Sequence, residues 1–281
     1  MKSLEREALA AAWDKATAAL ENDAMRPIRY AKCFRYLVSA LDRDARTLEA
    51  GCGEGSGLLF FRTIGFKRVT GIDVSFERLM RAKRKTDRDT ELLLISPNHG
   101  LPFKDECFDA VISAAVIEHT VDARFFVQEI ARVTRSGGCV IISSDCYSWR
   151  ILQMLGIYRS IQPIDRALFP TTLFRYFADS GLRLIHCEGF PDPLQEFRFL
   201  RLFVGHFIAL AKGMVRKVVP ESMRGLMRRY EASPAQSILS VEDLLQGFET
   251  FKPDSWKPRH WVLSFPKLVF SDENVFFLVK N

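Results

Sequence analysis

Short hydrophobic runs alternate with segments of helical spacing along the middle of the chain. Runs at residues 47–50, 68–73, 92–95, 108–113 and 139–143 have the length of strands, and the segments 76–85 and 123–134 have the spacing of helices. Two further runs, at 182–187 and 274–280, predict a sixth and a seventh strand. Strands that alternate with helices are typical of βαβ units, so we predict an α/β fold: a seven-stranded, mostly parallel sheet with helices on both faces.

The same pattern divides the chain into three parts. Residues 1–45 are predicted to form N-terminal helices, the second of which begins after Pro27, because proline suits the first helical position. Residues 46–189 and 273–281 hold the seven strands and form the core. The stretch 190–272 is too long for a plain connection, and its prolines separate helical patterns. It therefore predicts a helical insertion between the sixth and seventh strands.

Composition and charge narrow the class of protein. Of the 281 residues, 48% are hydrophobic and 26% charged, as in an ordinary globular protein, and the net charge is +6. Residues 62–88 carry nine Lys and Arg against three acids. Such a stretch is usually a set of solvated helix faces, and the alternative is attraction to an anionic partner.

Cysteine spacing and hydropathy bear on cofactors and on the compartment. The six cysteines form no C-x-x-C pair and have no accompanying histidine spacing, so no metal site is predicted. The longest apolar run, Leu202–Ala211, is too short to span a membrane, and acids interrupt the N-terminal segment, unlike a secretory signal. We therefore expect a cytoplasmic protein.

The strongest chemical signal is a glycine-rich segment that follows the first predicted strand. It reads Glu-Ala-Gly-Cys-Gly-Glu-Gly-Ser-Gly over residues 49–57 and leads into a predicted helix. Glycines allow a sharp turn and a close approach of the backbone to a ligand, and a helix start offers free N–H groups. The dinucleotide pattern G-x-G-x-x-G is not met, because its sixth position falls on Ser56 or Leu58. A nicotinamide-dependent oxidoreductase is therefore the weaker alternative.

Asp73 ends the second predicted strand, twenty residues beyond Gly53. A carboxylate there can accept both ribose hydroxyls of an adenosine ligand, because ligands bind outside the carboxyl ends of the strands. Alternatively it caps the following helix, for which Ser75 also offers a cap. The glycine-rich segment upstream favours the ligand.

Residues 47–145 resemble the class I S-adenosylmethionine-dependent methyltransferases of the type 11 family. The matching segments are TLEAGCGEGSG, GIDVSFERL, LPFKDECFDAVISAAVIEHTVD and EIARVTRSGGCVIISSD, in this order. The resemblance implies a Rossmann-like core and S-adenosyl-L-methionine as cofactor. A small-molecule acceptor is expected as the partner, and a nucleic acid is not.

The resemblance also implies a role for each matching residue. Glu49 would orient the methionine end of the cofactor, and Ala114 would offer its backbone to the same moiety. Asp73 would hold the ribose, and Val74 would lie beside the adenine. The backbone contacts would come from Gly51, Gly53 and Gly55. The acid that usually binds the adenine amino group is replaced by Pro97, and the amide oxygen of Asn98 is the substitute.

His119, after the fourth predicted strand, is the candidate general base. Methyl transfer from a sulfonium is an in-line displacement in which alignment dominates, and a hydroxyl acceptor also needs a base. The alternative is that His119 packs structurally at the rim of the site. Asp145 and Tyr147, after the fifth strand, are weaker candidates.

Residues 197–219 carry the one indication of the acceptor. Apolar side chains recur there at helical spacing, with basic side chains on the opposite face. We predict a helical cap over the acceptor site, and a membrane-interfacial helix is the less favoured alternative. The predicted function is methyl transfer to an oxygen, nitrogen or carbon of a small molecule that is apolar, lipid-linked or sugar-containing. A non-catalytic cofactor-binding scaffold stays open, as does the oligomeric state.

Overall fold

The computed structural model describes residues 11–12, 41–96, 100–145, 147–154, 163–190 and 273–281. The predicted N-terminal helices therefore lie almost wholly outside the described residues. The predicted insertion at 190–272, with its amphipathic stripe at 197–219, also lies outside them, apart from Phe190.

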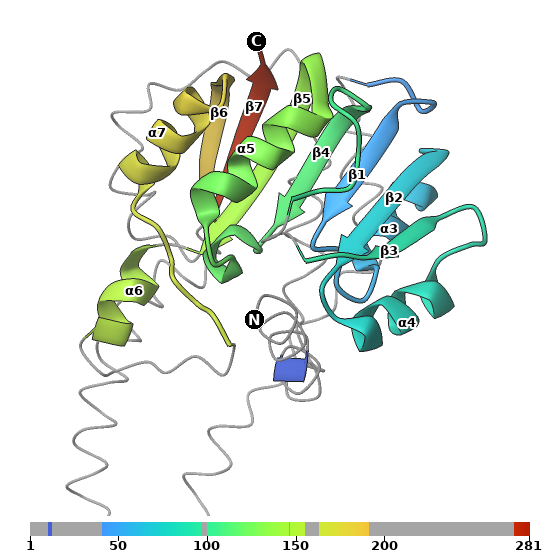
Figure 1. Cartoon of the computed structure of the whole chain (residues 1–281), viewed down its shortest axis with the longest axis horizontal. Helices are drawn as coiled ribbons and strands as arrows, with labels where there is room; N and C mark the ends of the chain where they lie inside the picture. Colours follow the sequence, from blue (N-terminus) through green and yellow to red (C-terminus); the bar gives the residue numbers. More distant parts are fainter. Residues whose placement is uncertain (1–10, 13–40, 97–99, 146, 155–162, 191–272) are drawn as a thin grey trace, which may run out of the picture. The chain divides into compact units, whose positions relative to one another are not determined.

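Seven strands form one sheet in the order β3-β2-β1-β4-β5-β7-β6 (Figure 1). Their bounds are β1 Arg46–Ala50, β2 Arg68–Asp73, β3 Glu91–Leu94, β4 Phe108–Ala114, β5 Thr134–Asp145, β6 Leu182–Phe190 and β7 Glu273–Lys280. The strands β1 to β5 pair in parallel, whereas β7 pairs antiparallel with both β5 and β6. The predicted seven-stranded, mostly parallel sheet is confirmed.

Helices follow the strands as the alternation predicted. Their bounds are α3 Ser56–Thr63, α4 Phe76–Lys85, α5 Ala123–Val133, α6 Tyr147–Met154 and α7 Pro170–Asp179, with a short 3-10 turn, η2, at Ile117–His119. Side-chain caps explain two of the starts: Ser75 accepts from the N–H of Arg78 before α4, and Asp122 accepts from the N–H of Phe125 before α5. Pro170 occupies the first turn of α7, where no backbone donor is needed.

The fifth strand begins five residues before its predicted start. It runs from Thr134, and the segment Arg135–Gly137 is exposed. A bulge shifts its register against β4 between Phe108 and Ala110. Hydrophobic patterning misses this half of the strand, because an exposed strand end carries polar residues and glycine.

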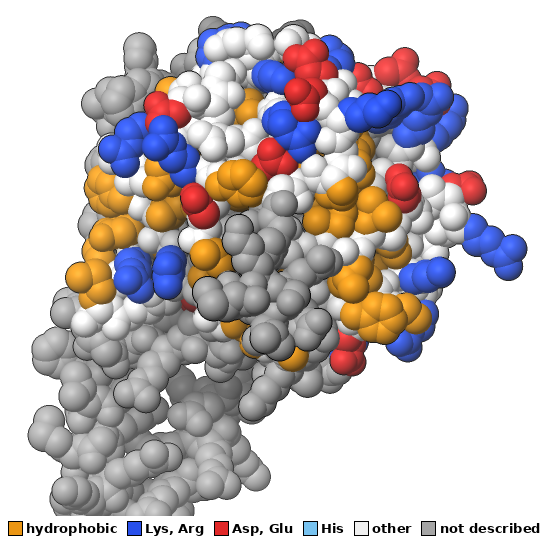
Figure 2. Space-filling view, in the orientation of Figure 1, with side chains coloured by type: hydrophobic (Ala, Val, Ile, Leu, Met, Phe, Trp, Pro, Cys, Tyr) orange, Lys and Arg blue, Asp and Glu red, His pale blue; other side chains and the backbone are white. Residues whose placement is uncertain are grey.

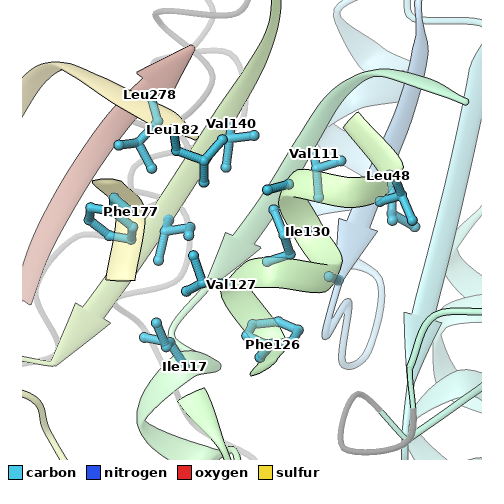
Figure 3. Packing of buried hydrophobic residues seen from close by; sticks show 14 of the residues in the cluster. Leu48, Val111, Ile117, Phe126, Val127, Ile130, Val140, Phe177, Leu182 and Leu278 are labelled. Carbon is cyan, nitrogen blue, oxygen red and sulfur yellow. The ribbon is translucent and has the colours of Figure 1, made fainter. Parts of the chain in front are cut away.

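Two layers of buried side chains flank the sheet, because successive residues of a strand point to opposite faces. On one face, α3 and α4 contribute Leu58, Phe61 and Leu79 to a cluster with Ile112 and Ile141 of the sheet. On the other face, α5 and α7 pack against the alternate residues of the same strands (Figure 3). The labelled members there include Leu48, Val111, Phe126, Val127, Ile130, Val140, Phe177 and Leu278. Packing on both faces therefore fixes the positions of β1, β2 and β4, whose carboxyl ends lie along the same edge of the sheet.

The basic stretch at 62–88 is largely compensated by nearby acids. Arg62 pairs with Asp87 at 2.6 Å, and Glu54 pairs with both Arg81 and Lys85 at 3.2 and 3.1 Å. Figure 2 shows Lys and Arg side chains interspersed with hydrophobic ones on the side of the molecule that carries β2, β3 and α4. This agrees with solvated helix faces. Among the described helices, none has the length and hydropathy needed to cross a membrane.

We expect Phe126→Ala in α5 to lower the free energy of unfolding by about 3–5 kcal/mol, because it leaves a cavity under the sheet. Phe126 is 0% exposed, whereas Phe76 at the start of α4 is 59% exposed. Phe76→Ala is the matched control and should change stability by no more than about 0.5 kcal/mol. Chemical denaturation of the two variants measures the difference, and equal losses would contradict the packing described above.

Candidate cofactor site

The glycine-rich loop between β1 and α3 is a backbone structure anchored to β2. The N–H groups of Gly51 and Cys52 both donate to the carbonyl of Ile72, at 2.8 and 2.9 Å. Gly51, Gly53 and Gly55 have φ angles of 85°, 52° and 77°. These lie in the left-handed region, which favours glycine because other residues carry a clashing Cβ. The alternating glycines of the sequence are thus explained by the turn itself.

The three glycines differ in what surrounds them. A Cβ on Gly51 would lie 2.3 Å from Cγ2 of Val116, and one on Gly55 would lie 2.8 Å from Cβ of Ala82. A Cβ on Gly53 would meet only Nη1 of Arg78, at 3.9 Å, among the described residues. Gly51 and Gly55 therefore allow the loop to pack closely against Val116 and Ala82. Gly53 leaves the space in which a ligand can approach the backbone.

Asp73, at the carboxyl end of β2, holds this loop in place. Its Oδ2 accepts from the N–H of Gly53 at 2.8 Å, and its Oδ1 accepts from the N–H of Ser75 at 2.9 Å. Its side chain is buried, and burial raises the pKa of Asp73 above its ordinary value, while the Arg78 guanidinium and the backbone donors oppose that shift. Ser75 supplies the helix cap, so Asp73 is not the cap of α4. Each carboxylate oxygen has a second lone pair for a ligand.

Two more groups lie beneath the loop. Glu49, on β1, is 0% exposed. Burial, followed by the charges of Asp73 and Glu49, raises the pKa of the Cys52 thiol well above its ordinary value. Cys52 is therefore a neutral, buried thiol and not a nucleophile.

The end of β4 turns sharply toward the loop. Ala114 is the last residue of β4, and Ala115 has a φ of 51°, which is unusual for a residue with a Cβ. The N–H of Ala115 points to Ser143 of β5, 2.9 Å from its hydroxyl and 3.2 Å from its carbonyl. The turn places Val116 against Gly51, so the two loops that follow β1 and β4 touch directly.

His119 ends the η2 turn three residues later. Its Nδ1 lies 2.7 Å from the carbonyl oxygen of Ile164. A carbonyl only accepts, so Nδ1 carries the proton and Nε2 of the neutral ring carries a lone pair. Nε2 lies 3.7 Å from Oε1 of Glu118, which is almost fully buried. Burial lowers the pKa of His119, against the raising influence of Asp145, the Ile164 carbonyl and Asp165, while the Arg78 charge lowers it further.

The structure brings most of the predicted residues to one edge of the sheet. Direct contacts connect Gly53 to Asp73, and Gly51 to the turn that leads from Ala114 to His119. Val74 is half-buried next to Asp73. Asn98 and the neighbouring Pro97 lie outside the described residues. The cofactor roles assigned to Glu49, Gly51, Gly53, Gly55, Asp73, Val74, Asn98 and Ala114 stay predictions.

The weaker base candidates differ in their surroundings. The N–H of Asp145 donates to Oε1 of Glu118 at 3.4 Å, which places Asp145 in the group around His119. The ring of Tyr147 packs edge-on against that of Phe169, with centroids 5.0 Å apart, which is a packing role.

Three residues of this edge, Arg78, Val116 and Glu118, were not among the predicted ones. Arg78 stands five positions after Asp73, in the first turns of α4. This short separation from Asp73 is the feature of the sequence that could have indicated it. Val116 is half-buried, and nothing in its sequence context marks it. In the part of the chain that the structure describes, no cluster of His, Cys, Asp and Glu could hold a metal ion.

A parallel sheet with a glycine-rich loop after β1 and a buried acid at the end of β2 defines a Rossmann-like domain for an adenosine ligand. Residues 48–142 match the family model described as a methyltransferase domain. Residues 48–142 therefore form a domain that is similar to the S-adenosylmethionine-dependent methyltransferases.

Relatives with curated names support this assignment. The chain is 32% identical over 145 residues to a malonyl-[acyl-carrier protein] O-methyltransferase of Hamiltonella defensa, a match that covers 51% of this chain and 54% of the relative. It is 27% identical to the Salmonella typhimurium protein of the same name, over 72% of this chain and 80% of the relative. The chain thus spans about half the length of the first relative.

A solved structure shares the fold. It is the complex between the Haloferax volcanii Trm112 methyltransferase activator and a methyltransferase, with a TM-score of 0.57 and 18% identity. The match covers 96% of this chain and 95% of that chain. At this identity the likeness concerns the fold alone.

The two kinds of glycine predict effects of different size and kind. We expect Gly53→Ala to cost about 1–2 kcal/mol of stability through its left-handed backbone and to weaken binding of S-adenosylhomocysteine about tenfold, because its Cβ occupies the open approach. Gly55→Ala should cost about 2–5 kcal/mol, because its Cβ also collides with Ala82. Thermal melting and titration calorimetry separate the two, and a greater stability loss in Gly53→Ala would refute this distinction.

The lowered pKa of His119 makes the stability of the protein dependent on pH. Below about pH 6.5 the unfolded chain takes up a proton on His119 before the folded protein does, so the free energy of unfolding falls. We expect His119→Gln to lose less stability than the parent between about pH 7.5 and 5.5. Urea denaturation at these pH values tests this, and parallel losses would mean that His119 is not held neutral.

Proposed function

We propose that the chain is a methyltransferase that transfers the methyl group of S-adenosylmethionine to an oxygen, nitrogen or carbon atom of a small-molecule acceptor. The observation that carries the proposal concerns Gly53. Its backbone is open to a ligand, and its N–H donates to the buried carboxylate of Asp73. This pair fits an adenosine ligand, because a carboxylate accepts ribose hydroxyls and a glycine permits close contact.

The chain's own groups divide into two sets. Asp73 and the loop backbone would bind the adenosine, while Glu49 and the end of β4 at Ala114 would face the methionine moiety. When bound, S-adenosylmethionine supplies a methyl group that is already activated by the sulfonium. The remaining work is to align the acceptor and exclude water, for which proximity is the main source of rate.

His119 is the group that would take a proton from the acceptor. Its tautomer leaves a lone pair on Nε2, and burial keeps the ring neutral at cellular pH. The nearby carboxylates of Glu118 and Asp145 favour the imidazolium once it forms. A hydroxyl acceptor benefits from such a base by about 10²–10⁴-fold.

The relatives that match are named for several different acceptors, so they suggest an acceptor without selecting one. Both named relatives are malonyl-[acyl-carrier protein] O-methyltransferases, and a malonyl group presents a carboxylate, which needs no base. The proposed acceptor is a small molecule that is apolar, lipid-linked or sugar-containing. A hydroxyl on such a substrate would need His119, whereas a carboxylate would not.

We expect Asp73→Asn to weaken binding of both S-adenosylmethionine and S-adenosylhomocysteine by about 1.5–3 kcal/mol, the usual worth of hydrogen bonds to a charged group. Asp109→Asn is the control, because Asp109 pairs with the Arg135 guanidinium and accepts from the backbone N–H of Arg46 at the opposite edge of the sheet. Titration calorimetry measures both, with NAD as a third ligand. Binding of NAD by the parent, without heat from either methionine derivative, would overturn the proposed function.

A further inference from the structure

Arg78 reaches from the first turns of α4 to the glycine-rich loop. Its Nη1 atom lies 3.9 Å from the position that a Cβ on Gly53 would take. Gly53 also donates its N–H to Oδ2 of Asp73 at 2.8 Å. The guanidinium and the carboxylate therefore both lie at the loop glycine that is open to a ligand.

The groups around Asp73 leave Arg78 as its main positive neighbour. Burial raises the pKa of Asp73, and the charge of Arg78 is the largest opposing influence, followed by the N–H groups of Ser75, Gly53 and Val74. The other ionisable groups at the loop are the Cys52 thiol, the Glu49 carboxyl group and the Glu54 carboxylate, and Glu54 is paired with Arg81 and Lys85. Of the basic side chains here, Arg78 is the one whose charge acts on the pKa of Asp73. His119, in the neighbouring turn, is kept neutral by burial.

A carboxylate accepts hydrogen bonds at both oxygens, whereas a protonated carboxyl group must also donate one. Both oxygens of Asp73 already accept backbone N–H groups that fix the loop and the start of α4. Protonation of Asp73 would therefore weaken the loop and remove the acceptor for a ribose at the same time.

We propose that Arg78 belongs to the cofactor site and that its guanidinium holds Asp73 in the carboxylate form that accepts the ribose hydroxyls. The proposal rests on the proposed function, since the ribose is that of S-adenosylmethionine. Arg78 acts through Asp73, so it is a positioning residue and not a catalytic one.

The contacts around Arg78 allow its guanidinium to be tested without disturbing the start of α4. The backbone N–H of Arg78 donates to Oγ of Ser75 at 3.2 Å, and this cap of α4 survives any replacement of the guanidinium. Arg84 offers a matched control on the same helix, because it is exposed and its Nε lies 3.3 Å from the carbonyl of Met80. Arg78→Met and Arg84→Met remove the same charge from α4, and Arg78→Lys retains it.

The first measurement is calorimetric titration with S-adenosylhomocysteine at about pH 8.5, 7.5 and 6.0. We expect Arg78→Met to bind nearly as well as the parent at about pH 8.5 and progressively more weakly as the pH falls, by up to about tenfold at about pH 6.0, because its Asp73 protonates at a higher pH. Arg78→Lys should stay within about threefold of the parent, and Arg84→Met should match it. Equal binding of Arg78→Met and the parent, or a loss that is the same at every pH, would overturn the proposal.

The second measurement needs no ligand. The amide NMR signals of Gly53 and Ser75 report the titration of Asp73, because both N–H groups donate to its carboxylate. Arg78→Met, or Arg78→Gln if the first variant does not fold, should move the midpoint of that titration to higher pH. An unmoved midpoint would refute the role of Arg78 even if the cofactor binds. Absence of S-adenosylhomocysteine binding in the parent, together with a shifted midpoint, would instead refute the proposed function.

Discussion

The carboxylate of Asp73 accepts two backbone N–H groups that come from different elements, and the candidate site depends on this double hydrogen bond. One donor, Gly53, belongs to the loop after β1, and the other, Ser75, begins α4. The loop has no regular structure, and its three glycines would otherwise be free to adopt many conformations. The end of β2 therefore fixes the positions of the loop, of the start of α4 and of the open side of Gly53.

A second contact extends this arrangement to the segment that follows β4. Val116 packs against the Cα of Gly51 so closely that a Cβ there would lie 2.3 Å from it. The strained Ala115 before it is held by Ser143, and His119 follows within one turn. The glycine-rich loop and the candidate base are therefore parts of one packed unit.

The sequence predicted those features whose cause is local. The bounds of α4 agree with its predicted range because Ser75 caps it and its apolar spacing is regular. The glycine-rich loop was found because its residue types are needed for its φ angles. Contacts between distant segments were not predictable: Val116 and Gly51 are far apart in the chain, and only the pairing of β1 with β4 brings them together. The polar first half of β5 was not predicted as a strand, because its residues face solvent and break the hydrophobic pattern.

The position of β7 has a consequence for how the molecule folds. This strand lies between β5 and β6, yet it follows β6 in the chain only after residues 191–272. Until residues 273–280 have been synthesised, β5 presents an unpaired edge and β6 has no neighbour in the sheet. Bringing together strands that are so far apart in the chain costs entropy before their pairing offsets it, which makes this step slow relative to the parallel core. During that interval the edge of β5 is open to pairing with other chains, so aggregation competes with completion of the sheet.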